Sequence, residues 1–198
     1  MEPLAARIRP KTLDEVVGQE HLVGRGKPLR VAMEKKHIFS FILWGPPGSG
    51  KTTIARIYAH SLDAELFELS AVSAGKDDIR KIVGLGVKGK SKVLFLDEIH
   101  RFNKAQQDFL LPSVESGALT LIGATTENPS FEVIAPLLSR CRVFVLEPLS
   151  EEALRAIIGR AKLKVPKDAC DWLLGYASGD ARKALGMLEG AQTLYGEV

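Results

Sequence analysis

The chain has 198 residues, of which 45% are hydrophobic and 26% charged, and its net charge is +3. This composition excludes a disordered or fibrous chain, and the charge is too small to indicate nucleic-acid binding by itself. The two cysteines, Cys141 and Cys170, cannot form a disulfide framework, so we expect a reducing, cytoplasmic location. The sequence shows no signal peptide and no apolar run of membrane-spanning length, which excludes secreted and membrane-spanning classes and predicts no membrane partner.

Residues 1–37 are mixed and polar, with turn residues at Pro10, Gly18, Gly24, Gly26 and Pro28. The next run, 38–44, is nearly all apolar and predicts a strand that is buried on both faces. Runs of the same character follow at 66–69, 93–96, 119–122 and 143–146. The sequence therefore predicts five strands.

Helical patterns lie between these strands, at 52–62, 77–83 and 103–114. The last begins with Asn103 as an N-cap and has Gln106 three residues later, the pattern of a capping box. Strands that alternate with helices predict an α/β fold with a five-stranded parallel sheet flanked by helices.

The pattern changes after Pro148. Ser150 followed by two glutamates indicates a helix start, and two more helical stretches follow at 167–177 and 180–194. Without a further strand, 148–198 is expected to be a small helical subdomain, called the lid below, and 1–147 the α/β core.

A phosphate-binding motif stands between the first strand and the following helix. It reads Gly45-Pro46-Pro47-Gly48-Ser49-Gly50-Lys51-Thr52 and fits the P-loop pattern G-x-x-x-x-G-K-[ST]. Its backbone N–H groups and the helix N-terminus would surround phosphate oxygens. Lys51 would reach the β- and γ-phosphates, and the Thr52 hydroxyl would bind Mg²⁺. A glycine-rich turn that merely caps a helix is the alternative.

Two adjacent carboxylates, Asp97 and Glu98, end the third predicted strand. Asp97 could hold the Mg²⁺ ion that Thr52 binds, and Glu98 could orient and deprotonate an attacking water. Taken alone, two acids after a strand are usually a solvated turn. Downstream of a P-loop they indicate nucleotide hydrolysis.

The motifs together resemble those of a known family. The P-loop followed by Asp97-Glu98 is similar to AAA+ ATPases, and Arg9–Gln19 resembles the N-terminal element of clamp-loader subunits and of the Holliday-junction branch-migration motor. With 97–107 (DEIHRFNKAQQ) and 123–131 (GATTENPSF), the chain resembles the replication-associated recombination protein A family, relatives of Werner-helicase-interacting protein. Because that family carries a further C-terminal oligomerisation region, the chain is expected to be truncated before it.

The resemblance implies ATP and Mg²⁺ as cofactors and assigns roles at matching positions. The segments that pack around adenine are expected to be Arg7–Pro10 and Val17-Gly18, with Arg7, Ile8, Val17 and Gly18 as site residues. The phosphate site extends to Thr53. The resemblance also implies three catalytic residues. Thr126 would sense the γ-phosphate or the attacking water, and Arg182 would lie over the phosphates from the lid. Arg140 would act in trans, on the ATP of the next subunit. For the adenine stretch, an ordinary docked N-terminal loop remains an alternative. Thr125 and Asn128 remain alternatives to Thr126.

A DNA contact is also implied, at the segment that contains Lys76, Arg80 and Lys81. Between residues 76 and 92 there are six basic residues against two acids, and no aromatic residue on which bases could stack. A solvated basic loop is the alternative. The chain has Ser70 where clamp loaders often place the asparagine that links substrate binding to the catalytic glutamate, which puts such a switch in doubt.

The expected function is a DNA-associated AAA+ ATPase that acts at stalled or gapped replication and recombination structures. It would be a nucleoid-associated homo-oligomer that binds single-stranded, gapped or forked DNA without sequence preference, alongside replication proteins. The alternatives are an ATP-gated scaffold or clamp-loader-like subunit with little hydrolysis, and a small-molecule P-loop kinase. The catalytic pair and Arg140 argue against a scaffold, and the lid argues against a kinase.

Overall fold

A computed structural model describes residues 2–87 and 89–196. Its centre is a single sheet with the strand order β2-β3-β4-β1-β5, in which all neighbouring strands are parallel. The strands are β1 (Phe41–Trp44), β2 (Glu65–Ser70), β3 (Lys92–Asp97), β4 (Thr120–Thr125) and β5 (Arg142–Val145). The predicted α/β class and five-stranded parallel sheet are confirmed.

The helices that follow the strands lie where the sequence predicts them, except for α7 and α8, which it does not predict. They are α4 (Lys51–Ser61), α5 (Lys76–Gly84), α6 (Lys104–Glu115), the short α7 (Pro129–Glu132) and α8 (Ala135–Leu138), and then α9 (Glu151–Arg160), α10 (Lys167–Ala177) and α11 (Ala181–Tyr195). A short 3₁₀ turn, η2 (Ile99–Arg101), follows β3. The α6 capping box is confirmed, because Asn103 and Gln106 exchange side-chain to backbone hydrogen bonds of 2.9 Å.

The N-terminal segment is more regular than its composition predicts. It contains α1 (Leu4–Arg7), the 3₁₀ turn η1 (Leu13–Glu15), α2 (Glu20–Val23) and α3 (Pro28–Glu34). Pro28 occupies the first turn of α3, where proline's fixed φ and missing N–H favour a helix start, so this residue carried the signal for α3.

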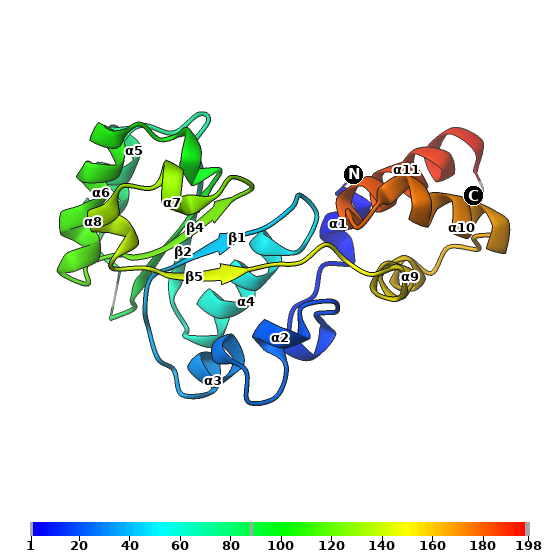
Figure 1. Ribbon diagram of the computed structural model, residues 1–198, viewed down its shortest axis with the longest axis horizontal. Coiled ribbons are helices and arrows are strands. Elements are labelled where there is room, and N and C mark those ends of the chain that lie inside the picture. Colours follow the sequence, from blue (N-terminus) through cyan, green and yellow to red (C-terminus); the bar gives the residue numbers. More distant parts are fainter. Residues whose placement is uncertain (1, 88, 197–198) are drawn as a thin grey trace.

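Alternation along the central strands divides the core into two layers. Phe41 and Leu43 of β1 pack on one face with α2, α3 and α4, while Ile42 between them packs on the other face with α5, α6 and α8. Figure 1 shows these two groups of helices on either side of the sheet. This three-layer arrangement buries the central strands on both faces.

The expectation of full burial is wrong for the two outer strands. β2 and β5 form the edges of the sheet, and Val143 and Val145 remain 39% and 48% exposed. The first strand also begins later than predicted, at Phe41. Before it, the backbone N–H of Phe39 donates to the Tyr58 hydroxyl at 3.0 Å instead of to a neighbouring strand.

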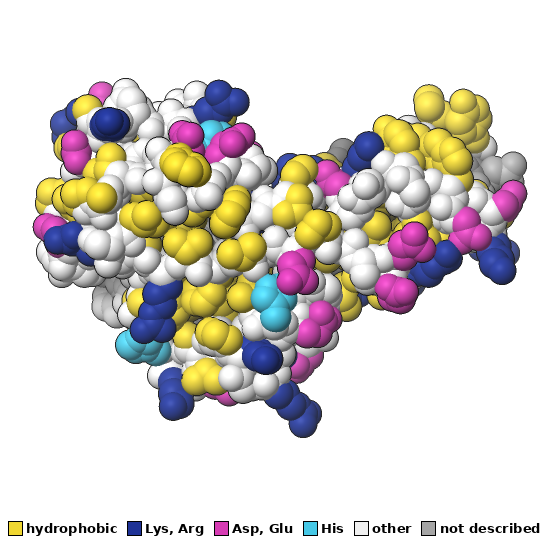
Figure 2. All heavy atoms as spheres, in the orientation of Figure 1, with side chains coloured by type: hydrophobic (Ala, Val, Ile, Leu, Met, Phe, Trp, Pro, Cys, Tyr) yellow, Lys and Arg dark blue, Asp and Glu magenta, His cyan; other side chains and the backbone are white. Residues whose placement is uncertain are grey.

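Helices α9, α10 and α11 form a body with an apolar cluster of its own, which extends away from the sheet (Figures 1 and 2). Helix α1 packs against α11, and the Leu4 N–H donates to Glu189 of α11 at 2.9 Å. Part of the predicted core, the first residues of the chain, thus lies on the lid. The division at 147/148 stays a prediction. No helix in the described ranges is long and apolar enough to cross a membrane.

Candidate active site

The loop between β1 and α4 has the backbone form that phosphate binding requires. Gly48 and Gly50 have φ of +69° and +105°, in the left-handed region that glycine adopts without strain. Gly50 is the N-cap of α4 and supplies no side chain to cap the first N–H groups of that helix. These N–H groups and the positive end of the helix dipole are therefore free to face an anion.

The Lys51 ammonium lies inside this loop. Its Nζ donates to the carbonyl oxygens of Gly45 at 2.7 Å and Pro46 at 2.9 Å. Burial lowers the pKa of Lys51, while the nearby carboxylates of Glu98 and Asp97 act in the opposite direction. A buried ammonium that is held only by neutral carbonyls is well suited to bind phosphate oxygens.

Asp97 and Glu98 lie at the carboxyl end of β3 and line the same cavity as Thr52. One strand, β4, separates β3 from β1, so the backbones of β3 and β1 lie about 10 Å apart, and side chains from the two strand ends reach into the space between them. A carboxylate and a hydroxyl are hard oxygen donors, the ligands that Mg²⁺ prefers, so the donor set of Asp97 and Thr52 fits this ion. Glu98 has a left-handed backbone, with φ of +55°, which turns the chain sharply after Asp97.

One cavity brings most of the predicted site residues together, with β3, β4, the P-loop, the N-terminal segment and the lid all contributing. Those that line it are Ile8, Val17, Pro47, Gly48, Ser49, Gly50, Lys51, Thr52, Thr53, Asp97, Glu98, Thr126 and Arg182. Thr126, which directly follows β4, lines the cavity, whereas Thr125, the last residue of β4, is fully buried and bonded elsewhere.

Four other residues predicted for the nucleotide lie outside the lining. Gly45 and Pro46 contribute their carbonyls to Lys51 from behind the loop. Arg7 is exposed on α1. Gly18, with φ of +81°, packs against the lid, where an added Cβ would lie 2.6 Å from the Leu149 side chain.

Two further arginines line the cavity. Arg9 lies in the predicted adenine stretch Arg7–Pro10 without having been named as a site residue, and Arg160 was not predicted. Burial lowers the pKa of Arg9, and the neighbouring Arg56 lowers it further. Its Nη1 is buried with no hydrogen-bond partner among the described residues. Arg160 stands three residues after Ile157, another lining residue, and this helical spacing was the available signal.

The buried amide of Gln19 ties the P-loop to the start of the lid. Its Nε2 donates to the carbonyl of Ser49 at 3.3 Å and to that of Glu147 at 2.8 Å, and its Oε1 accepts from the Glu147 N–H at 3.1 Å. Gln19 is completely inaccessible to solvent. A buried amide with this many partners fixes the relative position of the groups it bonds.

The lid also touches the P-loop directly. Asp180 caps α11 by accepting from the N–H groups of Arg182 and Lys183, at 2.9 and 3.1 Å. A Cβ on Gly48 would lie only 1.8 Å from the Asp180 carboxylate and 2.9 Å from the Ala181 nitrogen. The lid arginine Arg182 is therefore placed over the cavity by a helix whose first residues rest on the loop.

Arg140 lies far from this cavity, beyond α8, in a hollow at the opposite end of the strands that Ser40 and Thr120 also line. The stretch from Ser40 to Gly45 spans about 16 Å at the rise of a β-strand. Arg140 is ion-paired with Glu115 and donates to the Pro136 carbonyl at 2.7 Å. This location excludes contact between Arg140 and the cavity of its own chain.

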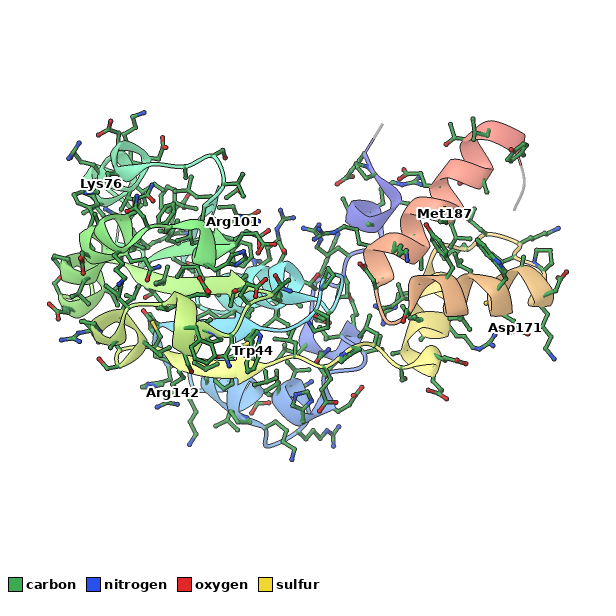
Figure 3. All side chains as sticks on the ribbon, turned by 45° about the horizontal axis from the view of Figure 1, so that its top comes forward. Trp44, Lys76, Arg101, Arg142, Asp171 and Met187 are labelled. Atoms are coloured by element: carbon green, nitrogen blue, oxygen red, sulfur yellow. The ribbon has the colours of Figure 1, made fainter. Side chains whose placement is uncertain are left out.

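The predicted DNA-contacting residues lie on α5, and Figure 3 shows Lys76 at the end of the molecule remote from the lid. All three are exposed, but Arg80 is paired with Asp77, and Lys81 lies 3.8 Å from Asp78. Of the basic loop at 88–92, Lys88 lies outside the described residues. Lys90 and Lys92 are engaged with Asp63 and with the Val83 carbonyl.

A parallel sheet with a P-loop after β1 and a carboxylate pair after β3 defines a P-loop nucleoside triphosphatase. A family model described as "ATPase family associated with various cellular activities (AAA)" matches residues 41–149. Replication-associated recombination protein A from Coxiella burnetii is 50% identical over 94% of this chain and 46% of its own length. The same-named protein of Escherichia coli K12 is 44% identical over 95% of this chain and 45% of its own length.

Among solved structures, the Thermotoga maritima RuvB Holliday junction branch migration motor is similar, with a TM-score of 0.76 and 30% identity. That similarity covers 96% of this chain and 68% of the RuvB chain. The chain thus belongs to the AAA ATPases and, within them, to the replication-associated recombination protein A family. It spans less than half the length of the curated relatives named here.

The contact between the P-loop and the lid gives a first prediction. Gly48→Ala forces a left-handed backbone on alanine and places a methyl group against the α11 N-terminus. We expect the free energy of unfolding to fall by about 1–2 kcal/mol and nucleotide affinity to weaken about tenfold or more. Thermal or denaturant unfolding and titration with a fluorescent ATP analogue measure the two effects.

Gly84→Ala is the matched control, because Gly84 ends α5 and an added Cβ there meets open space. It should leave nucleotide affinity unchanged. If Gly48→Ala behaves like Gly84→Ala in both measurements, the close approach of the loop to the lid is not a constraint on the site.

Proposed function

We propose that this chain is the motor part of a DNA-associated ATPase that hydrolyses ATP at stalled or gapped replication and recombination structures. The observation that carries the proposal is the single cavity in which Glu98 and Thr126 face the P-loop residues Lys51 and Thr52. A nucleotide-binding scaffold needs the loop alone, whereas hydrolysis needs a base and a polar group on the far side of the phosphates.

Each residue has a distinct task in this proposal. The P-loop N–H groups and Lys51 bind the phosphates, and Thr126 orients the terminal phosphate or the attacking water. Glu98 accepts the proton of that water as it attacks the γ-phosphorus, after which the bond to the β,γ-bridging oxygen breaks and ADP and phosphate leave. Arg182 neutralises phosphate charge from the lid.

Thr52 and Asp97 would hold Mg²⁺, which neutralises charge on the β- and γ-phosphate oxygens when it is bound. The apolar side of the cavity, formed by residues such as Ile8, Val17 and Leu185, suits an adenine ring. The three arginines Arg9, Arg160 and Arg182 give this cavity an excess of positive charge, which suits a triphosphate.

Arg140 acts on the nucleotide of a neighbouring copy. This assignment is supported by its place at the end of the strands opposite its own cavity. A planar guanidinium can neutralise charge on the transferred phosphoryl group, provided that it first leaves the Glu115 carboxylate. The active protein is then a homo-oligomer.

DNA as partner is supported by the names of the relatives, which refer to replication-associated recombination and to a Holliday junction motor. On this chain the exposed basic residues of α5 are the candidate contact, and a contact with phosphates alone would not read sequence. In such a role the protein acts at the chromosome, alongside replication proteins. Its location is then cytoplasmic and nucleoid-associated.

The roles of Glu98 and Lys51 separate in binding and turnover. Glu98→Gln should bind Mg·ATP with near-normal affinity while turnover falls by about 10²-fold or more, because only the base is lost. Lys51→Ala should weaken ATP binding itself, because it removes a cation that contacts the phosphates before reaction. Equilibrium ATP titration and phosphate release distinguish the two variants. Normal turnover by Glu98→Gln would remove Glu98 from the mechanism.

The trans role of Arg140 predicts complementation between inactive subunits. Arg140→Ala and Glu98→Gln should each hydrolyse poorly as pure oligomers. Mixed oligomers should regain activity, because a Glu98→Gln subunit can offer its Arg140 to an intact cavity on an Arg140→Ala subunit. Phosphate release is measured across mixing ratios. Glu98→Gln combined with Arg140→Ala in one chain is the control partner, and it should restore nothing. Equal activity from both mixtures would contradict the assignment.

The DNA contact predicts a change in salt dependence. Replacing Lys76, Arg80 and Lys81 with alanine should weaken binding to all duplex sequences alike and flatten the slope of log K against log salt by up to about three units per engaged subunit. Affinity for ATP without DNA should not change. Because Arg80 and Lys81 have acidic neighbours on α5, we expect Lys76→Ala to account for the largest single share.

The control for this experiment is Lys162/Lys164/Lys167→Ala, which removes the same charge from exposed positions on the lid. Replacing Lys90 and Lys92 tests the alternative basic surface. An unchanged slope for the α5 variant, or a larger loss from either other set, would mean that DNA binds elsewhere.

A further inference from the structure

The imidazole of His100 lies between the catalytic carboxylate and the end of strand β4. Its Nδ1 is 3.0 Å from the Thr125 hydroxyl oxygen and 3.3 Å from Oε2 of Glu98. The His100 side chain is only 11% exposed and belongs to η2, the turn that directly follows Glu98. One ring nitrogen therefore touches two residues on neighbouring strand ends.

The partners of Thr125 determine which atom carries the proton. The Thr125 hydroxyl accepts from the Glu127 N–H at 2.9 Å and donates its single hydrogen to the Glu127 carbonyl at 3.1 Å. It can then only accept from His100, so the hydrogen-bond inventory assigns a proton to Nδ1.

The same proton faces the Glu98 carboxylate. Oε2 of Glu98 is buried without a hydrogen bond, and among the described residues no other donor reaches it. A buried carboxylate oxygen without a donor is costly. The Nδ1–H of His100, with its nitrogen 3.3 Å away, is the donor placed to supply one when the ring turns slightly from Thr125. The left-handed backbone at Glu98 and the hydrogen bond from Arg101 N–H to its carbonyl, at 2.8 Å, fix the turn.

We propose that His100 is a positioning residue for Glu98: its Nδ1–H holds one carboxylate oxygen and thereby orients the other toward the cavity. The link through Thr125 anchors the imidazole to β4, one residue before Thr126. This inference rests on the proposed role of Glu98 as the base. In this arrangement His100 links Glu98, the proposed base, to the neighbouring strand β4, and the link does not involve Ser70.

Variants at His100 test the link because amide side chains can replace one ring nitrogen at a time. In His100→Asn the amide nitrogen is bonded to Cγ, as Nδ1 is, so a donor remains near Glu98. In His100→Gln the amide lies one bond further out, near the place of Nε2. His100→Ala removes both, and His60→Ala, on the exposed end of α4, is the control.

We expect kcat to fall about tenfold in His100→Ala and His100→Gln, with ATP affinity within twofold of the unchanged protein. His100→Asn should keep kcat within about threefold, and His60→Ala should not alter it. In a Glu98→Gln background, His100→Ala should cause no further loss, because the residue it positions has already been replaced.

The outcomes separate this inference from the proposed function. If the unchanged protein does not hydrolyse ATP, the proposed function fails, and the inference with it. If it hydrolyses ATP and His100→Ala retains full kcat, the inference alone is overturned. Failure of His100→Asn to rescue, a parallel loss of ATP affinity, or an additive loss in the Glu98→Gln background would each show a purely structural His100 and overturn it as well.

Discussion

The buried amide of Gln19 is the interaction on which the geometry of the site depends. It joins three parts of the chain that lie far apart in sequence: the N-terminal segment, the P-loop through Ser49, and the start of the lid through Glu147. Unpaired backbone polar groups are costly inside the protein. Loss of this amide would leave such groups unsatisfied both in the P-loop and at the start of the lid. These hydrogen bonds hold the P-loop and the start of the lid in a fixed relative position.

The parallel sheet supplies the rest of the arrangement. Because β1, β3 and β4 run in the same direction, the P-loop, Asp97 and Thr126 emerge at one edge. Arg140 precedes β5 and lies at the other edge. A single chain thus presents its P-loop cavity at one end of its strands and Arg140, paired with Glu115, at the other.

Local patterns were sufficient for much of this structure. The P-loop and the Asn103–Gln106 capping box are contiguous, so their chemistry can be read without knowing the fold. The burial of the outer strands could not be predicted, because an apolar run such as 143–146 looks the same at the centre and at the edge of a sheet, and only the strand order decides which it is.

The same limit applies to Arg9, Arg160 and Gln19. Arg9 and Gln19 belong to a stretch with a family resemblance, and Arg160 follows Ile157 at helical spacing. These patterns do not give the contacts of the three side chains, which result from packing between the N-terminal segment, the sheet and the lid. The site was thus predictable where function resides in one segment. It was not predictable where three segments meet.

The N-terminal segment has a mechanical consequence. Helix α1 and Val17 pack on the lid, while Leu13 and Val16 pack on the layer beside the sheet. The lid is therefore attached to the rest of the chain along the N-terminal segment as well as at residues 146–149. A body attached at one point can pivot in any direction, whereas a body attached at two turns about the line through both. Because the lid is held along two segments of the chain, it has fewer directions in which it can turn than a body joined by a single linker.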